Sequence, residues 1–310
     1  MAEGSLESPT RHIIPWQDEE FTDPQYLDTE LRRVFDICHG CRRCFNLCDS
    51  FPRLFDLIDD SKSGELDTVA SKDFKPVVDA CTLCDMCFMT KCPYVPPHEF
   101  NLDFPHLMLR YRAKEFNDGK VKYSHRQMTK TDRNGKVAAP IAGLVNWITK
   151  SGNKITRPLL EKLGGIHQKA DLPKFTGQPF SKRPSQPIKN GGVRKVVLYS
   201  TCSVNYNNPQ IGDVTQAILA KNGVVTEVVY PSCCGMPQLE QGDIAQVAKN
   251  ATRVASELVE WIERGYAILA LVPSCALMLK FEWPLILPDD KNIKRLSEST
   301  FDITEYIVDI

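Results

Sequence analysis

The sequence contains no long hydrophobic run. Within its 310 residues, no stretch approaches the roughly 18 apolar residues that a membrane-spanning helix needs. Residues 1–27 are acidic and interrupted by proline, and they lack the basic start and apolar centre of a signal peptide. We therefore expect an irregular acidic tail at this end, in a protein of the reducing cytoplasm.

Several functional motifs are also missing. We find no Ser–His–Asp set, no phosphate-binding loop and no nucleotide-binding fingerprint. The basic residues are not interleaved with aromatic residues and form no known nucleic-acid-binding motif. We therefore expect substrate chemistry to belong to a partner protein, and we do not expect nucleic acid as a partner.

Cysteine, by contrast, is abundant. Eight of the twelve cysteines fall into two similar runs, Cys38-x2-Cys41-x2-Cys44-x3-Cys48 and Cys81-x2-Cys84-x2-Cys87-x4-Cys92-Pro93. This spacing is typical of proteins that hold two 4Fe–4S clusters, because each tight run places three thiolates around one cluster. The sequence therefore predicts two such clusters.

The fourth ligand of each cluster is expected to come from the other run. In two-cluster ferredoxins the last cysteine of a run binds the other cluster. This rule predicts two ligand sets, cluster 1 with Cys38, Cys41, Cys44 and Cys92, and cluster 2 with Cys48, Cys81, Cys84 and Cys87. A core assembled around metal would fold poorly without iron and sulfide.

Two other uses of these cysteines compete with this interpretation. Structural zinc sites favour two Cys-x2-Cys knuckles far apart, so a third and a fourth cysteine close behind fit zinc badly. Disulfide bonds suit small secreted chains and not a reducing compartment. Three basic residues, Arg42, Arg43 and Lys91, lie inside the runs, and they would favour the reduced clusters if their charges faced them.

The chain divides by composition into five parts. The acidic tail is followed by an expected helical ferredoxin-like domain at 28–103, a basic helical segment at 104–170, a linker rich in Pro and Gly at 171–192 and an α/β domain at 193–310. Helices are expected in the ferredoxin-like part because residues 52–58 and 74–80 carry apolar residues at three- and four-residue steps. A first helix is expected over 28–35.

The middle of the chain is strongly basic. Residues 105–190 carry 18 Lys and Arg against 5 Asp and Glu. We expect a helix over 104–116, a polar turn at Asp132–Gly135, and two helical stretches over 138–148 and 155–163 with apolar faces beside lysines. Such stretches lie on an anionic membrane surface, bind an acidic partner, or pack on a neighbouring domain.

The last part alternates strands and helices, which predicts a parallel α/β sheet. Strands are expected over 195–200, 224–230 and 267–272, with helices over 211–222 and 242–263. The four remaining cysteines follow these strands: Cys202 the first, Cys233 and Cys234 the second, and Cys275 the third. Because ligands gather at the carboxyl ends of parallel strands, we expect a metal or redox site there. The alternative is four buried cysteines that act as small hydrophobic residues.

Local motifs around these cysteines resemble a known family. The run Cys233-Cys234-Gly235, with Thr201-Cys202 before it and Pro273-Ser274-Cys275 after it, is similar to the CCG, or cysteine-rich, domain of heterodisulfide reductase-related proteins. Following two four-cysteine runs, it resembles the iron–sulfur subunits of anaerobic glycerol-3-phosphate dehydrogenase and of glycolate and lactate oxidation. The resemblance implies a further iron–sulfur centre at Cys202, Cys233, Cys234 and Cys275, or service to a membrane-side electron acceptor.

The chain departs from the family in two respects. Met278 stands where heterodisulfide reductase has a second cysteine of its third loop, which weakens the case for its disulfide-cleaving chemistry. Family members commonly carry two CCG halves, whereas one half is found here, ending in an apolar-faced segment at 303–310. The second half is expected on another chain, is missing from this sequence, or is not needed.

The expected function is iron–sulfur electron transfer. The chain would be the electron-carrying subunit of a flavoprotein dehydrogenase or related oxidoreductase complex, in the cytoplasm or peripheral at the inner face of the membrane. The first alternative is an enzyme that reduces a disulfide or organic acceptor at the CCG site. The second is a structural zinc-binding scaffold. No motif in the sequence identifies the electron donor or the electron acceptor, and none gives the reduction potential.

Overall fold

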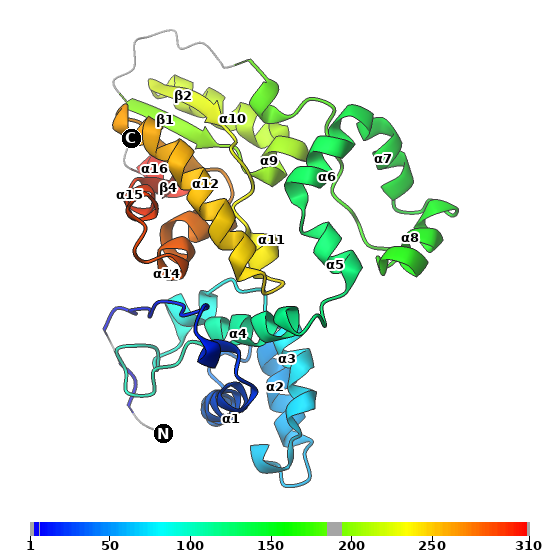
Figure 1. Cartoon of the computed structure of the whole chain (residues 1–310), viewed down its shortest axis with the longest axis vertical. Helices are drawn as coiled ribbons and strands as arrows, with labels where there is room; N and C mark the ends of the chain where they lie inside the picture. The colour runs from blue at the N-terminus through cyan, green and yellow to red at the C-terminus, as the bar shows by residue number, and fades with distance from the viewer. Residues whose placement is uncertain (1–2, 6, 185–193, 309–310) are drawn as a thin grey trace. The chain divides into compact units, whose positions relative to one another are not determined.

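A computed structural model describes residues 3–5, 7–184 and 194–308. The chain forms two compact units. Unit 1 comprises Met1–Val121 and Leu239–Ile244, and unit 2 comprises Lys122–Gln238 and Ala245–Ile310. Each unit has its own buried residues, and neither is a single continuous stretch of chain (Figure 1).

Unit 1 is helical, as the sequence predicts. Its α-helices are α1 (Pro24–Cys41), α2 (Ser50–Asp59), α3 (Lys75–Ala80) and α4 (Phe104–Asn117). Short 3-10 or π turns occupy η1 (Glu19–Thr22), η2 (Leu66–Thr68), η3 (Ser71–Phe74) and η4 (Cys87–Lys91).

Helix α1 begins at Pro24 rather than at Asp28. The Asp23 side chain caps it by accepting the backbone N–H groups of Gln25 and Tyr26, and proline at the first helical position suits such a start. The helix runs on to Cys41 and ends where Arg42 adopts the left-handed conformation, with φ of 52°. Two of the predicted ligands therefore lie in its last turn.

The core of unit 1 is built from phenylalanine. Phe35 of α1 meets Phe74 edge-on, with ring centroids 5.1 Å apart, and Phe51 of α2 lies 4.7 Å from Phe104 of α4. All four side chains are buried. These contacts join helices that come before, between and after the two cysteine runs, so packing brings the runs into one unit.

Unit 2 contains the predicted parallel sheet. Its strands are β1 (Arg194–Tyr199), β2 (Val224–Val229), β3 (Ala267–Ala270) and β4 (Thr300–Asp302), in the order β2-β1-β3-β4. All neighbouring strands are parallel. The three longer strands confirm the sequence prediction, whereas β4 was not predicted because three residues are too short to show a hydrophobic pattern.

Helices flank these strands. The longer ones are α10 (Pro209–Lys221), α12 (Ile244–Glu263) and α15 (Lys291–Glu298). Shorter ones are α9 (Cys202–Tyr206), α11 (Met236–Leu239), α13 (Pro273–Leu277), η7 (Met278–Glu282), α14 (Trp283–Ile286) and α16 (Ile303–Val308). Residues 196–199 of β1 are fully buried, as expected for a strand covered on both faces.

From Lys122 onward, the basic segment belongs to unit 2 and forms a series of short helices. They are α5 (Tyr123–Met128), α6 (Thr131–Ala138), η5 (Ala139–Ile141), α7 (Ala142–Thr149) and α8 (Thr156–Gly164). The predicted polar turn at Asp132–Gly135 is wrong, because these residues lie within α6. Gly135 packs directly against the ring of Tyr206, and this tertiary contact outweighs the polar local sequence.

Part of the expected linker at 171–192 packs against the sheet of unit 2. It contains η6 (Phe180–Lys182), and the Phe180 side chain is buried in a cluster with Val196, Leu198 and Leu219 of the sheet unit. Gly212 on α10 leaves room for the Phe180 ring. Residues 185–192 of the expected linker lie outside the described part of the chain.

Part of the apolar faces of the basic helices is open to solvent. We call this set the apolar stripe; it consists of Ile141, Leu144, Trp147, Leu159 and Leu163, which are 49–74% exposed. Lys150 and Lys154 lie between α7 and α8 and are also exposed. Among the described residues, no helix combines the length and the hydrophobicity that a transmembrane span requires.

Candidate functional site

The eight cysteines of the two runs all lie in unit 1. Cys38 and Cys41 end α1, and Cys44 and Cys48 occupy the turns before α2. Cys81 follows α3, Cys87 opens η4 and Cys92 follows it. Leu83 and Asp85, which flank Cys84, both have positive φ values, of 49° and 59°. Non-glycine residues rarely adopt this conformation, and it often marks a functional loop.

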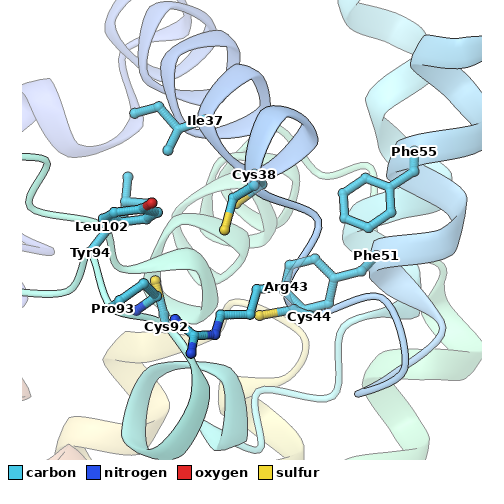
Figure 2. Close-up of a pocket in the computed structure, with 11 residues that line it drawn as sticks. Ile37, Cys38, Arg43, Cys44, Phe51, Phe55, Cys92, Pro93, Tyr94 and Leu102 are labelled. Carbon is cyan, nitrogen blue, oxygen red and sulfur yellow. The ribbon is translucent and has the colours of Figure 1, made fainter. Parts of the chain in front are cut away.

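One pocket in unit 1 brings together cysteines from both runs. Cys38, Cys41 and Cys44 of the first run and Cys92 of the second all line it (Figure 2). Phe51, Phe55, Tyr94 and Leu102 make up most of the remaining wall. This is the ligand set predicted for cluster 1, held in surroundings that are otherwise mainly apolar.

The four cysteines predicted to bind cluster 2 differ in how far they are buried. Cys81 and Cys87 are buried, whereas Cys84 is exposed. Burial raises the pKa of Cys81 to about 11, and the nearby Cys48 and Cys84 contribute to this rise. Cys87 lies within electrostatic reach of cysteines in both runs, since burial raises its pKa and Cys81, Cys44 and Cys38 add to the effect.

The thiols that line the pocket resist ionisation when no metal compensates their charge. Burial raises the pKa of Cys44 to about 12, and it also raises the pKa values of Cys38 and Cys92. A buried thiolate needs a compensating positive charge. A metal centre supplies that charge and displaces the protons, so the chemistry of this donor set fits an iron–sulfur group.

The basic residues inside the runs divide into two kinds. Lys91 lowers the pKa of Cys44, and Arg43 lowers that of Cys92, against the larger effect of burial. Arg42 instead binds the Asp59 carboxylate. Arg43 and Lys91 therefore act on the cysteines, and Arg42 pairs with a carboxylate of α2.

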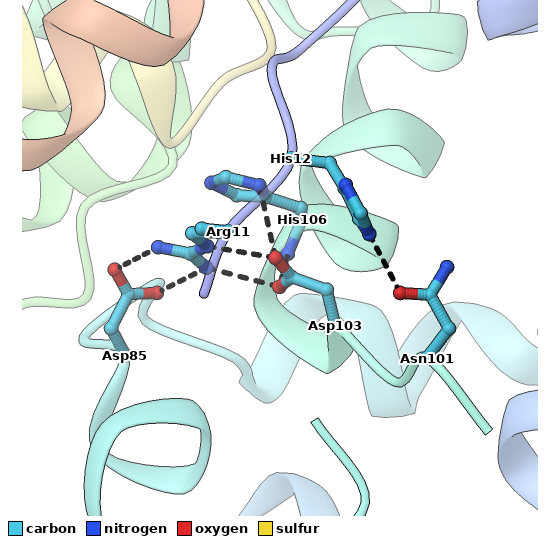
Figure 3. A network of polar contacts seen from close by, with 6 residues as sticks. All are labelled: Arg11, His12, Asp85, Asn101, Asp103 and His106. Carbon is cyan, nitrogen blue, oxygen red and sulfur yellow. Dashed lines mark hydrogen bonds and ion pairs between the residues drawn. The ribbon is translucent and has the colours of Figure 1, made fainter. Parts of the chain in front are cut away.

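Arg11, which no sequence pattern indicates, binds the second cysteine run. Its guanidinium donates two hydrogen bonds to Asp85, at 2.5 and 2.9 Å, and two to Asp103, at 2.7 and 3.0 Å (Figure 3). Burial alone would raise the pKa of Asp103, but His106 and Arg11 outweigh it and hold this pKa well below its usual range. Arg11, in the expected acidic tail, thus holds Asp85, which lies between Cys84 and Cys87.

Arg112 of α4 is a second residue that the sequence did not reveal. Its guanidinium donates to the carbonyl oxygens of Val78 and Cys81 at the start of the second run, and to that of Glu240 at 3.1 Å. A buried arginine that binds only backbone leaves no pattern in the sequence. Its donors reach carbonyl groups at and just beyond the end of α3, where the helix itself supplies few backbone donors.

The second group of cysteines lies in unit 2, where three loops converge as predicted. Cys202 begins α9 after β1, Cys233 and Cys234 follow β2, and Cys275 lies in α13 after β3. The Sγ atoms of Cys233 and Cys202 are 3.6 Å apart, and those of Cys234 and Cys275 are 3.2 Å apart. Neighbouring cysteines thus turn toward different partners. Two of the four lie inside short helices, which the sequence did not indicate.

Hydrogen bonds fix the loop that carries Cys233 and Cys234. Tyr199 Oη donates to the carbonyl of Ser232 at 2.7 Å, and Trp283 Nε1 donates to that of Cys234 at 3.1 Å. Asp132 of α6 accepts the backbone N–H of Cys233 at 3.0 Å and the hydroxyl of Tyr230. Asp132, which the sequence placed in a turn, therefore belongs to this site.

Hydrogen bonding shifts the pKa values of three of these thiols in different directions. Hydrogen bonds with Cys202 and Cys234 outweigh burial and lower the pKa of Cys233 well below its ordinary value. The same bonds raise the pKa values of Cys202 and Cys234. Two close thiol pairs of this kind suit metal binding or thiol chemistry. Over the described ranges, no three Cys, His, Asp or Glu side chains are grouped closely enough for one metal ion.

Comparison with known proteins adds a family and several relatives. Residues 196–280 match the cysteine-rich domain family, CCG. The chain is 28% identical over 172 residues to the C subunit of anaerobic glycerol-3-phosphate dehydrogenase from Escherichia coli (strain K12), covering 54% of this chain and 43% of the relative. It is 31% identical over 123 residues to lactate utilization protein A of Bacillus pumilus (strain SAFR-032), covering 37% of this chain and 49% of the relative.

These matches confirm the resemblance that the cysteine motifs predict. The carboxy-terminal part of the chain contains a CCG domain that holds all four cysteines of unit 2. The chain spans about half the length of the curated relatives it matches, or less. No solved structure matches it.

Proposed function

We propose that this chain is an iron–sulfur electron-transfer protein and the electron-carrying subunit of a flavoprotein dehydrogenase or related oxidoreductase complex. The pocket lined by Cys38, Cys41, Cys44 and Cys92 carries this proposal. Four cysteines from two distant runs around one apolar pocket suit a cluster bound by four thiolates. The similarity to a dehydrogenase subunit and to a lactate utilization protein supports the same role.

The protein would hold two 4Fe–4S clusters in unit 1. Cluster 1 takes the four cysteines of the pocket, and cluster 2 takes Cys48, Cys81, Cys84 and Cys87. Such clusters exchange one electron at a time. The chain holds the thiolates, excludes water with its phenylalanine core, and places Arg43 and Lys91 where positive charge favours the additional electron.

The CCG site supports a second candidate function. Cys202, Cys233, Cys234 and Cys275 form two close thiol pairs, which suits a further iron–sulfur centre or an enzyme that reduces a disulfide or organic acceptor. In either case unit 1 would supply the electrons, so both functions require the same two clusters.

Iron and sulfide analysis of protein purified without oxygen tests the main proposal. We expect about eight irons per chain from two clusters, and appreciably more if the CCG site also holds a centre. Electron paramagnetic resonance of the reduced protein should show two interacting centres. A colourless protein that contains zinc would contradict the proposal and favour a structural scaffold.

A pair of cysteine variants tests the ligand sets. Cys92→Ser should remove the signal of one cluster and about four irons, whereas Cys234→Ser should leave both clusters of unit 1 reducible. If Cys234→Ser abolishes turnover with an acceptor while the clusters stay reducible, the CCG site is the catalytic centre. If Cys92→Ser leaves the iron content unchanged, the assignment of cluster 1 is wrong.

We also infer a peripheral location at the inner face of the membrane. The apolar stripe on η5, α7 and α8 is exposed, and it lies beside the exposed Lys150 and Lys154. Apolar residues flanked by lysines suit binding to the surface of an anionic bilayer. This location would bring the protein close to a membrane-side electron acceptor.

A further inference from the structure

Unit 2 contains a large pocket that neither cysteine group occupies. Its volume is about 750 Å³, within the range of small-molecule sites. The end of α6, residues 177–184 and the side chains of Asn205, Tyr206 and Tyr230 enclose it. Three parts of unit 2 that are distant in sequence thus meet around one hollow.

The charged side chains of this pocket are all basic. They are Lys136, Lys182 and Arg183, and no Asp or Glu is among the described residues that line it. Arg183 is neutralised by Asp213. Lys136 and Lys182 are exposed and have no ion-pair partner in the described part of the chain. The pocket therefore carries about two uncompensated positive charges, which concentrate anions.

Polar and aromatic groups complete the lining. Gln178 and Ser181 lie on one wall, and the rings of Tyr206 and Tyr230 meet edge-on with centroids 5.7 Å apart. A ligand would therefore find cations for an acidic group and ring surface for an apolar part. Pockets that combine a few polar groups with aromatic walls are typical of organic ligands.

Two hydrogen bonds connect this pocket with the CCG site. The Tyr230 hydroxyl on its wall donates to one oxygen of Asp132, and the other oxygen accepts the N–H of Cys233. The pocket wall and the cysteine loop are thus held by the same carboxylate. A molecule bound against Tyr230 would lie next to the cysteine site.

We propose that this pocket binds a small organic anion, carrying a phosphate or a carboxylate group, beside the cysteine site of unit 2. Lys136 and Lys182 bind the anionic group, and Tyr206 and Tyr230 contact the rest of the molecule. This gives the excess of basic residues in the middle of the chain a role in ligand binding. The proposal goes beyond electron transfer and does not depend on it, since the pocket contains none of the cysteines.

Equilibrium dialysis of the full chain against radiolabelled inorganic phosphate, and separately against radiolabelled acetate, tests the proposal. We expect saturable binding of at least one of these probes with one site per chain. The double variant Lys136→Ala, Lys182→Ala should bind that probe at least about tenfold more weakly, since hydrogen bonds to charged groups are strong. The matched control is Lys150→Ala, Lys154→Ala, which removes the same charge from exposed positions outside the pocket and should bind like the unaltered protein.

Acetylation of lysines followed by mass spectrometry provides a second measurement without any substitution. The bound probe should slow modification of Lys136 and Lys182 at least about tenfold at saturation, in line with occupancy of the site, and leave Lys150 unchanged. Binding of neither probe, equal loss in both double variants, or no protection of Lys136 and Lys182 would each overturn the proposal. Because these readouts do not involve iron, a protein without clusters that still binds the anion would contradict only the proposed electron transfer.

Discussion

At the scale of single residues, the cysteine runs depend on arginines that lie far away in the sequence. Arg11 binds Asp85 between two predicted ligands of cluster 2, and Arg112 binds the carbonyl oxygen of Cys81. Neither arginine is a ligand, yet each holds the backbone on which the ligands stand. Such supporting contacts decide whether a metal site keeps its geometry.

We predict that Arg11→Ala destabilises unit 1. The substitution leaves Asp85, whose side chain is 3% exposed, and Asp103, which is 20% exposed, without the guanidinium between them. Breaking a buried ion pair costs about 3 kcal/mol, and urea denaturation measures the loss. As a control, Arg53→Ala removes an exposed pair with Asp49 and should cost at most about 1 kcal/mol. Equal effects of the two substitutions would mean that the Arg11 contacts contribute little.

The residue scale also shows what the sequence can reveal. The cysteines are recognisable because fixed spacing is a signal within a short segment, and the meeting of Cys202, Cys233 and Cys275 follows from the rule for parallel strands. Arg11 and Asp132 were missed because their partners lie far away along the chain. A pairing of that kind leaves no periodic trace in one sequence.

At the scale of elements, α10, α12 and the strands β1 to β3 follow their hydrophobic patterns, whereas β4 and short helices such as α9 and α13 have no pattern of their own. Helix α6 is the clearest case, since Asp132 and Gly135 have the composition of a turn but lie in a helix. Its conformation depends on packing against Tyr206 and on the contacts of Asp132 with the cysteine loop. Patterns that depend on such tertiary contacts cannot be seen locally.

Substitution of two glycines tests this account of α6. Gly135→Ala should destabilise unit 2 by about 1–3 kcal/mol, because the new methyl group would collide with the Tyr206 ring. Gly143→Ala in α7 meets no atom within 4 Å and should instead stabilise the protein by about 0.5–1 kcal/mol, as expected in an open helix position. Thermal unfolding measures both. A neutral Gly135→Ala would mean that α6 does not pack as described.

At the scale of the whole molecule, the distribution of charge and apolar surface bears on the location of the protein. We predict that it co-sediments with vesicles of anionic phospholipid and that salt weakens this binding. Lys150→Ala, Lys154→Ala should reduce the binding free energy by about 1 kcal/mol per lysine, and Lys136→Ala, Lys182→Ala serves as the matched control. Binding that neither added salt nor the loss of Lys150 and Lys154 weakens would exclude electrostatic attachment.

The order of the two units along the chain has a practical consequence for dissecting the protein. Leu239–Ile244 belongs to unit 1, although it connects the end of α11 with the start of α12, whose other residues belong to unit 2. Arg112 donates to the carbonyl of Glu240 there, and the backbone at Arg112 leaves no room for a side chain at Gly242. A fragment ending at residue 121 would therefore lack Glu240, one of the acceptors of Arg112. The remaining fragment would still carry Leu239–Ile244, which belongs to unit 1. Recombinant halves would need that piece grafted back, for example by circular permutation or as an added synthetic peptide.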